Sequence, residues 1–438
     1  MEWIDAATAA ERLGVKPATL YAYVSRGVLK RRHDGRRSMF DAEEIERLAR
    51  RGRPRGQPPE LVIESAITAL ALDRPHYRGR DALALAPVAS FEAVAEWLWT
   101  ADPAALELRG HAAPVWSADP EALRAAVAVQ RGLPEGILPL DRLQVIVTVL
   151  GASDSLRYHL DPESVTATAR RLIAGLVEAL PLIQPPAAST TTIPAIPTVP
   201  ALGGRPGSPI TSPAVPASGD SRSLSTASSI AERLWPRLSP LPATPALVRT
   251  LEAALVLLAD HELAASTLAA RVAASARADP YAVVLTGLGV LGGPLHGGAS
   301  YAAERLLAEA ATPAQAPRVI ADRIRRGERV PGFGHSVYKN GDARGRLLMD
   351  LVAEAAPGHE RLATAQAVLE EVRRRRLPER NVDFALATLV AVTSMISGAG
   401  EAVFAIARTA GWLAHAMEEY ATGSLLRLRA AYVGPPIR

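Results

Sequence analysis

The chain has 438 residues and a formal net charge of +4, yet the excess positive charge lies entirely in residues 1–57, which carry 13 basic and 8 acidic side chains. This distribution excludes a uniformly basic nucleic-acid coat protein and predicts a small basic module joined to a near-neutral body. The absence of cysteine excludes disulfides, thiol nucleophiles and cysteine-ligated metal centres, and it fits a reducing compartment. The first residues lack the basic and apolar regions of a signal peptide, so we expect a cytoplasmic protein.

Two short helices open the basic module. Residues 5–14 place apolar side chains on one stripe and end at a glycine, which predicts the first helix. The second helix should span residues 17–27, because it begins at a proline, whose missing N–H has no cost there, and ends at a glycine. Thr19, Tyr23 and Arg26 follow a helical spacing on this second helix, and we expect them to face outward.

A basic hairpin and a third helix complete the module. Asp34-Gly35, between two extended runs over residues 28–40, predicts a two-residue turn, and a helix should follow over residues 41–51. This order resembles the winged helix-turn-helix of the MerR and excisionase type. The resemblance implies that the outward stripe reads the DNA major groove, and that Arg36 and Arg37 contact phosphates or the minor groove. A small helical cap with solvated charges, or a module that binds protein, is the alternative.

A linker over residues 50–59 leads to a body that is helix after helix. Helices are expected near residues 91–99, 121–131, 140–150, 162–180 and 228–238. Residues 184–223 hold nine prolines and three charged residues, which predicts an insertion or an internal linker. No strand series is evident outside the hairpin, so we expect a mainly α fold. The uncharged stretch 384–400 is short for a membrane span, and a buried helix is the better interpretation.

Two histidines lie in glycine-rich loops, where a ligand can approach the backbone closely. His296 is flanked by glycine pairs, and His335 ends the segment Pro-Gly-Phe-Gly-His. Backbone groups in such loops can fix the imidazole tautomer. Each histidine alone is more often structural, but two such loops together favour a catalytic role. Asp383 opens a very apolar helix, and its residue context alone predicts a helix N-cap.

Several segments resemble the signatures of the citrate synthase family and occur in that family's order. These segments are His76–Gly79, Ser90–Glu92, Asp260–Leu263, Gly293–Ala299, Pro331–His335, Tyr338–Asn340, Asp342–Arg344, Asn381–Phe384, Arg408 with Gly411-Trp412, and Arg427 with Tyr432–Gly434. The resemblance implies a helical two-domain fold behind a winged helix-turn-helix over residues 1–57. The large domain would span residues 58–294 and 395–438, and the small domain would span residues 295–394.

The family condenses acetyl-CoA with oxaloacetate and then hydrolyses the citryl thioester. The resemblance implies that Asp383 removes a proton from the acetyl methyl group, that His296 donates a hydrogen bond to the thioester oxygen, and that His335 polarises the ketone. By the same resemblance, the oxaloacetate carboxylates would be held by His261, Arg344, Arg408 and Arg427. In the family the last of these arginines comes from the neighbouring subunit, so we expect an obligate homodimer.

Coenzyme A carries phosphates that need cationic partners. The residues proposed to contact them are Lys339, Arg373, Arg374 and Arg376. For the arginine run, a solvated helix face is an equally good interpretation. We expect no permanently bound cofactor and no metal, with acyl-CoA as a co-substrate.

Five positions depart from the residues that are usual in the family. They are Ala264, Ser300, Ser336, Ala343 and Leu428. None removes a proposed catalytic group, but they leave the acyl-chain preference open. Three functions therefore stand: a citrate synthase, a 2-methylcitrate synthase that uses propionyl-CoA, and a DNA-binding regulator whose synthase body senses a ligand. The complete set of proposed catalytic groups argues against pure sensing.

Overall fold

The computed structural model describes residues 3–13, 15, 17–25, 28–34, 37–42, 44–45, 48, 62–71, 73–107, 116–183, 228–338, 341–428, 430 and 434. The chain divides into two compact units, Met1–Glu64 and Ser65–Arg438, and each is described by itself. The predicted linker over residues 50–59 and the proline-rich segment 184–223 lie outside the described residues. The division of the body into a large and a small domain stays a prediction.

A three-stranded antiparallel sheet accompanies the two helices of the first unit. Its elements are β1 (Trp3–Asp5), α1 (Ala6–Leu13), α2 (Pro17–Ser25), β2 (Arg31–Asp34) and β3 (Arg37–Asp41), with the strand order β1-β3-β2. The sequence predicted the hairpin but missed β1, which is too short to show an alternating pattern. Asp34 pairs with Arg37, so Asp34 belongs to the strand and not to the turn. The third predicted helix is described only in part.

The exposed face of α2 differs from the predicted outward stripe. Thr19 and Tyr23 are half-buried, and Tyr23 packs against the small core around Leu20 and Phe40. The backbone N–H groups of Val28 and Leu29 donate to the Tyr23 carbonyl, which places the buried Leu29 beside the end of α2. The backbone of Arg37 is in β3, but its side chain, and Arg26 and Arg36 as a whole, lie outside the described residues.

A small antiparallel sheet opens the second unit, and the sequence analysis missed it. Its strands are β4 (Thr68–Ala71), β5 (Arg74–Tyr77) and β6 (Arg80–Asp81), in the order β4-β5-β6. Tyr77 pairs with Arg80, and both intervening residues have positive φ angles, 46° at Arg78 and 82° at Gly79. These angles suit the tight type I′ hairpin turn. The Tyr77 hydroxyl donates to the carbonyls of α10, which fixes the sheet on the helical core.

Helices build the rest of the body, as the sequence predicted. They are α4 (Ala82–Leu85), α5 (Phe91–Thr100), η1 (Pro103–Glu107), α6 (Pro120–Gln130), α7 (Pro139–Ser153), α8 (Pro162–Glu178), α9 (Ile230–Leu238), α10 (Pro245–Leu258), α11 (Ala265–Ser275), α12 (Pro280–Leu291), α13 (Gly298–Glu309), η3 (Pro313–Gln315), α14 (Ala316–Arg325), α15 (Ala343–Ala355), α16 (Glu360–Arg374), α17 (Val382–Val392) and α18 (Ala399–Thr422). Asp119, Asp161 and Asp279 each precede a proline and cap a helix, which is the favoured order of residues at a helix start.

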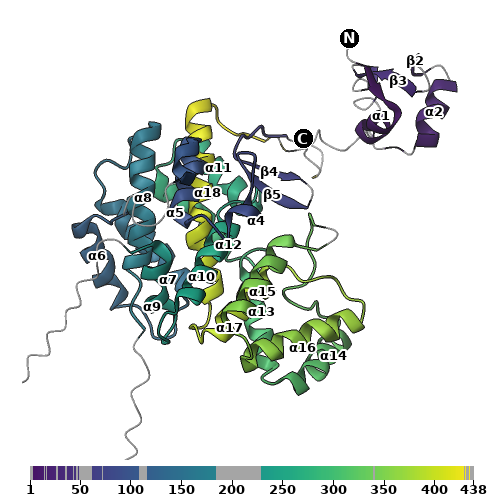
Figure 1. The fold of residues 1–438 in the computed structure, drawn as a ribbon. Coiled ribbons are helices and arrows are strands. Elements are labelled where there is room, and N and C mark those ends of the chain that lie inside the picture. Colours follow the sequence, from purple (N-terminus) through teal and green to yellow (C-terminus); the bar gives the residue numbers. More distant parts are fainter. Residues whose placement is uncertain are drawn as a thin grey trace, which may run out of the picture. The chain divides into compact units, whose positions relative to one another are not determined.

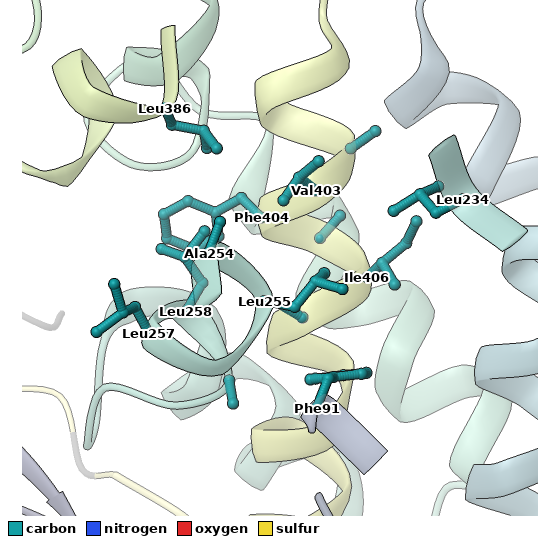
Figure 2. Packing of buried hydrophobic residues seen from close by; sticks show 14 of the residues in the cluster. Phe91, Leu234, Ala254, Leu255, Leu257, Leu258, Leu386, Val403, Phe404 and Ile406 are labelled. Atoms are coloured by element: carbon teal, nitrogen blue, oxygen red, sulfur yellow. The ribbon is translucent and has the colours of Figure 1, made fainter. Parts of the chain in front are cut away.

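The long helix α18 forms the centre of the body (Figure 1). It packs against α5, α8, α10, α11 and α12, and almost every side chain along it is buried. Figure 2 shows Val403 and Ile406 of α18 among Phe91, Leu234 and Leu255, which come from three other helices. Each such side chain stabilises the fold by ~1.5–3 kcal/mol through burial alone. This core fixes the side chains that α18 contributes to the site.

A second group of helices, α13 to α17, lies together at the lower right of the body in Figure 1. Helix α17 packs against α13, α15 and α16. The apolar stretch 384–400 is divided between two helices, because α17 ends at Val392 and α18 begins at Ala399. Within the described part of the chain, no helix has both the length and the apolar character needed to cross a membrane.

Candidate active site

Two of the predicted histidines meet beside a tyrosine to which the sequence analysis gave no role. His261 follows α10, and His335 lies in the loop between α14 and α15. Their ring centroids are 5.5 Å apart. Tyr338 stacks on His335 with a centroid distance of 4.5 Å, and its hydroxyl lies 2.8 Å from His261 Nε2. Burial, and secondarily Arg344, lowers the pKa of His261 well below its ordinary value, so that ring is neutral.

The loop geometry selects one tautomer of His335. Its Nδ1 accepts hydrogen bonds from the backbone N–H groups of Val337 and Tyr338, at 3.0 and 3.2 Å. The ring proton is therefore on Nε2. Glycine permits this loop, because Gly332 has a φ of 82° and a Cβ there would lie 2.8 Å from the Phe384 Cβ.

The surroundings of His296 fit the opposite tautomer. Its Nε2 lies 2.7 Å from the Ser266 hydroxyl, which accepts the indole N–H of Trp412 at 3.3 Å. A Ser266 hydroxyl that donates to His296 Nε2 leaves the imidazole proton on Nδ1. Burial, with Arg408, lowers the pKa of His296 to about 4, so the ring is a neutral hydrogen-bond donor.

Asp383 is not the N-cap of its helix, and the interpretation from residue context alone was wrong. Asn381 caps α17 instead, because its side-chain oxygen accepts the backbone N–H groups of Asp383 and Phe384. The Asp383 carboxylate is thereby left for other contacts and accepts the Ser300 hydroxyl at 2.6 Å. Burial raises the pKa of Asp383 to about 6, and Ser300 opposes this rise. Ser300, one of the departures from the family pattern, therefore touches the proposed base.

Arg344 is committed mainly to another residue of this chain. Its Nε and Nη2 atoms donate to the two carboxylate oxygens of Asp342, at 3.0 and 2.9 Å. Asp342 holds the pKa of Arg344 above its ordinary range, although burial opposes this effect. The predicted carboxylate-binding role of Arg344 is therefore left to the two N–H groups of Nη1, the second N–H of Nη2 and its positive charge.

Arg408 is the opposite case, a buried guanidinium without an anion. It is 1% exposed, and its Nε donates to the Leu258 carbonyl at 2.8 Å. No described residue accepts a hydrogen bond from Nη1 or Nη2. Burial lowers the pKa of Arg408 to about 10, so it is still charged at neutral pH. A buried charge without a partner is costly, and a bound carboxylate would satisfy both nitrogens.

Two known families match the chain. The family described as "Citrate synthase, C-terminal domain" matches residues 59–429, and the "Helix-turn-helix domain" matches residues 3–53. The chain belongs to the citrate synthase family. This result confirms the helical citrate synthase fold and the helix-turn-helix module that the sequence predicted.

Individual relatives agree with the family assignment. "Citrate synthase 2" of Bacillus subtilis is 28% identical over 400 residues, which cover 87% of this chain and 96% of the relative. "2-methylcitrate synthase" of Mycobacterium tuberculosis is 29% identical over 364 residues, covering 82% and 84%. The crystal structure of citrate synthase from Thermotoga maritima has a TM-score of 0.64 at 25% identity and covers 87% of this chain and 95% of that one.

Arg427 is the last of the arginines that the resemblance assigns to the substrate carboxylates. It does not lie among the other site residues of this chain. It is exposed in the segment that follows α18. Its expected contribution to a neighbouring subunit stays a prediction.

The proposed contacts to coenzyme A lie on or near the end of α16. Arg373, Arg374 and Arg376 are exposed, and Arg374 forms an ion pair with Glu371 at 2.7 Å. This pairing favours the solvated-face interpretation for Arg374. Lys339 lies outside the described residues.

Behind Arg408 lies a buried network that the sequence analysis missed. His415 Nε2 is 3.3 Å from Asp260 Oδ2, and His415 Nδ1 is 2.9 Å from Arg271 Nη1. Although burial acts to raise the pKa of Asp260, His415 and Arg408 hold it below its ordinary value. The resulting carboxylate balances part of the Arg408 charge. Gly411 makes room for it, because a Cβ there would meet an Asp260 oxygen at 2.3 Å.

Proposed function

We propose that the protein condenses acetyl-CoA with oxaloacetate and releases citrate and coenzyme A. The observation that carries this proposal is the set of contacts that the proposed acid and base groups make. Asp383 is a carboxylate of raised pKa that accepts the Ser300 hydroxyl, His335 accepts two backbone N–H groups at Nδ1, and His296 contacts Ser266 through Nε2. A base together with two neutral donors suits proton removal next to a carbonyl group.

Formation of the enol needs a base and a donor together. Asp383 accepts a proton from the methyl group of acetyl-CoA, and the thioester oxygen receives a hydrogen bond from His296 Nδ1–H. Because burial keeps His296 neutral, the developing charge meets a donor and not a full cation. Ser266 holds the ring in the required tautomer.

Carbon–carbon bond formation then needs an activated ketone. The enol carbon attacks the oxaloacetate ketone, whose oxygen takes the Nε2 proton of His335 and becomes the citrate hydroxyl. The substrate carboxylates pair with Arg408 and with the remaining N–H groups of Arg344, while His261 donates a hydrogen bond beside them. Water then cleaves the citryl thioester, which gives citrate and free coenzyme A.

Acyl-CoA enters as a co-substrate, and this mechanism uses no permanently bound cofactor and no metal. The exposed Arg373 and Arg376, together with Lys339, are the proposed contacts for its phosphates. We further propose a homodimer in which Arg427 completes the carboxylate site of the neighbouring subunit. A citrate synthase of Thermoplasma acidophilum has been solved as a ternary complex with carboxymethyl coenzyme A and oxaloacetate, at 23% identity and a TM-score of 0.63.

The second candidate activity is 2-methylcitrate synthesis from propionyl-CoA. The relative of that name supports it, because its identity to this chain is similar to that of the Bacillus citrate synthase. The same residues would carry the chemistry. A pocket discriminates one methylene group by only about 10–200-fold, so small changes in its shape decide the preference.

The helix-turn-helix module gives the third candidate, a DNA-binding regulator in the cytoplasm. Its match to the helix-turn-helix family supports contact with DNA. A strong fall in DNA affinity with added salt would support this role, because phosphate contacts release counterions.

One assay separates these functions. Release of free thiol is followed with acetyl-CoA and with propionyl-CoA, each with oxaloacetate, for the native chain and for Asp383→Asn. We expect faster turnover with acetyl-CoA and a loss of about 10²–10⁴-fold in kcat for the variant, because the amide cannot act as the base. Faster turnover with propionyl-CoA would favour the second function. No turnover with either, together with salt-dependent DNA binding, would favour the regulator.

A further inference from the structure

A cavity of about 430 Å³ lies on the other face of the loop that carries His296. Its wall includes Asp141 and Gln144 of α7, Tyr301 of α13 and Glu401 of α18. Pro294 and Gly298, which stand on either side of His296 in the sequence, also line it. The mechanism proposed above uses none of the four polar residues of this wall.

Glu401 is the unusual member of this wall. Glu401 is only 4% exposed, and no described residue donates a hydrogen bond to its side chain or pairs with it. The Glu401 carboxylate therefore takes its solvation from the cavity that it lines, and not from the chain. The backbone N–H groups of Gly398 and Gly400, at the start of α18, donate to Glu304 at 2.8 and 2.9 Å.

The charges around Glu401 are also negative. Burial, then Glu304 of α13 and Asp141 of α7, raises the pKa of Glu401 to about 7. Tyr301 is the other titratable group of the wall, and α12 contributes only glycine. Among the described residues, none of the ion pairs includes Asp141, Glu304 or Glu401. The cavity therefore has acceptors and negative charge but no cation.

We propose that this cavity binds a guanidinium group, held by the Glu401 carboxylate and surrounded by the oxygens of Asp141, Gln144 and Tyr301. A guanidinium is planar and donates two parallel hydrogen bonds to one carboxylate. A divalent metal fits less well, since the described residues contain no cluster of three or more ligating side chains. The group comes either from a free small molecule or from an arginine of a second copy of this chain.

The cavity adjoins the loop of His296. Pro294 and Gly298 form part of the wall, and Gly298 is tightly placed, because a Cβ there would lie 2.9 Å from the Gly292 carbonyl oxygen. A ligand in the cavity would therefore contact this loop.

The first test uses methylguanidinium as the probe for a free ligand. Calorimetric titration at pH 8, against tetramethylammonium chloride of equal concentration, should show saturable binding of methylguanidinium only. Glu401→Gln should weaken this binding at least tenfold, and Asp141→Asn should weaken it less. Glu370→Gln, an exposed carboxylate on α16, is the matched control and should leave the affinity unchanged. Binding to the native chain should also weaken as the pH falls below about 7, where Glu401 takes up a proton.

The second test addresses an arginine from another copy. Sedimentation at a series of protein concentrations measures self-association of the native chain, of Glu401→Gln and of Glu370→Gln. If Glu401→Gln alone weakens association at least tenfold and the free probe does not bind, the guanidinium comes from a second copy. If the probe binds through Glu401, the free ligand is supported. If Glu401→Gln is folded by circular dichroism and changes neither probe binding nor association, the proposal is wrong.

Discussion

Arg408 and Glu401 are buried charges of opposite sign on the same helix, seven residues apart. Two turns of an α-helix separate them, so they lie on nearly the same side of α18, about 10 Å from one another along its axis. Arg408 lacks an anion and belongs to the proposed oxaloacetate site. Glu401 lacks a cation and lines the cavity behind the His296 loop.

Arg408 and Glu401 differ from buried charges that form ion pairs within the chain. Arg271 is as deeply buried as Arg408, yet it forms ion pairs with Glu418 and Glu419 at 2.7 and 2.5 Å. A paired charge stabilises the arrangement of its neighbours, whereas an unpaired one is satisfied only by a ligand. The unpaired charges of α18 therefore indicate binding sites, and the paired charges indicate structure.

We expect the largest effects when Arg408 or Arg271 is replaced. Arg408→Gln should lower kcat/KM by about 10²–10³-fold, because a substrate carboxylate loses its buried charged partner. Its melting temperature should change less than that of Arg271→Gln, since no described residue forms an ion pair with Arg408, although Asp260 loses a nearby positive charge. Arg271→Gln, the matched control, should lower the stability by ~3–5 kcal/mol, because the buried Glu419 and the half-buried Glu418 lose theirs. Steady-state kinetics and thermal unfolding check both, and equal destabilisation by the two variants would contradict the distinction.

The pH dependence of kcat/KM tests the role of Asp383 as the base. Asp383 must be ionised to accept a proton, and burial raises its pKa to about 6. Below that pH, kcat/KM should therefore fall by about tenfold per pH unit. Ser300→Ala removes a hydrogen bond that lowers this pKa, so the fall should begin at a higher pH. A pH–rate profile measures both, and a profile of Ser300→Ala that coincides with the native one would rule out this coupling.

A smaller effect is expected on the free energy of unfolding when Glu401 is replaced. Its pKa is raised from 4.5 to about 7, so the folded chain binds the proton more tightly than the unfolded chain does. Stability should therefore decrease as the pH rises through this range. Glu401→Gln should be more stable than the native chain by ~1–3 kcal/mol at pH 8, with the difference vanishing near pH 4.5. Urea unfolding at both pH values measures it, and a variant that is less stable at pH 8 would show that Glu401 has a structural partner.

The smallest effect concerns the N-terminal unit, which contains neither charge. Deletion of residues 1–57 should change kcat and both KM values by less than a factor of two. The same thiol-release assay with native and truncated chains tests this expectation. A tenfold loss after deletion would mean that the basic module takes part in the reaction cycle.

Motifs predicted the reacting groups better than they predicted the groups around them. The loops of His296 and His335 were identified from glycine, which their tight backbone requires. Ser266 was not assigned a role, because a single serine in a helix has no distinctive pattern. Asp383 was interpreted as the N-cap because aspartate is a common cap residue. Asn381, two residues earlier, caps a helix equally well and is the cap here.

The secondary-structure elements and the buried residues show the same limit, because a short stretch of sequence does not reveal either of them. The strands β4 to β6 were missed, because runs of four, four and two residues cannot show alternation. Tyr23 follows the expected helical spacing, yet it packs against the core around Leu20 and Phe40. Glu401 lies in the first turn of α18, where an acidic residue normally faces water and favours the helix dipole. Only its burial distinguishes it.

Glu304 also has a mechanical consequence. Its carboxylate, on α13, accepts the backbone N–H groups of Gly398 and Gly400, on either side of the first residue of α18. One side chain therefore fastens the start of the central helix to the helix that follows His296. These two hydrogen bonds therefore limit independent movement of α13 and of the start of α18.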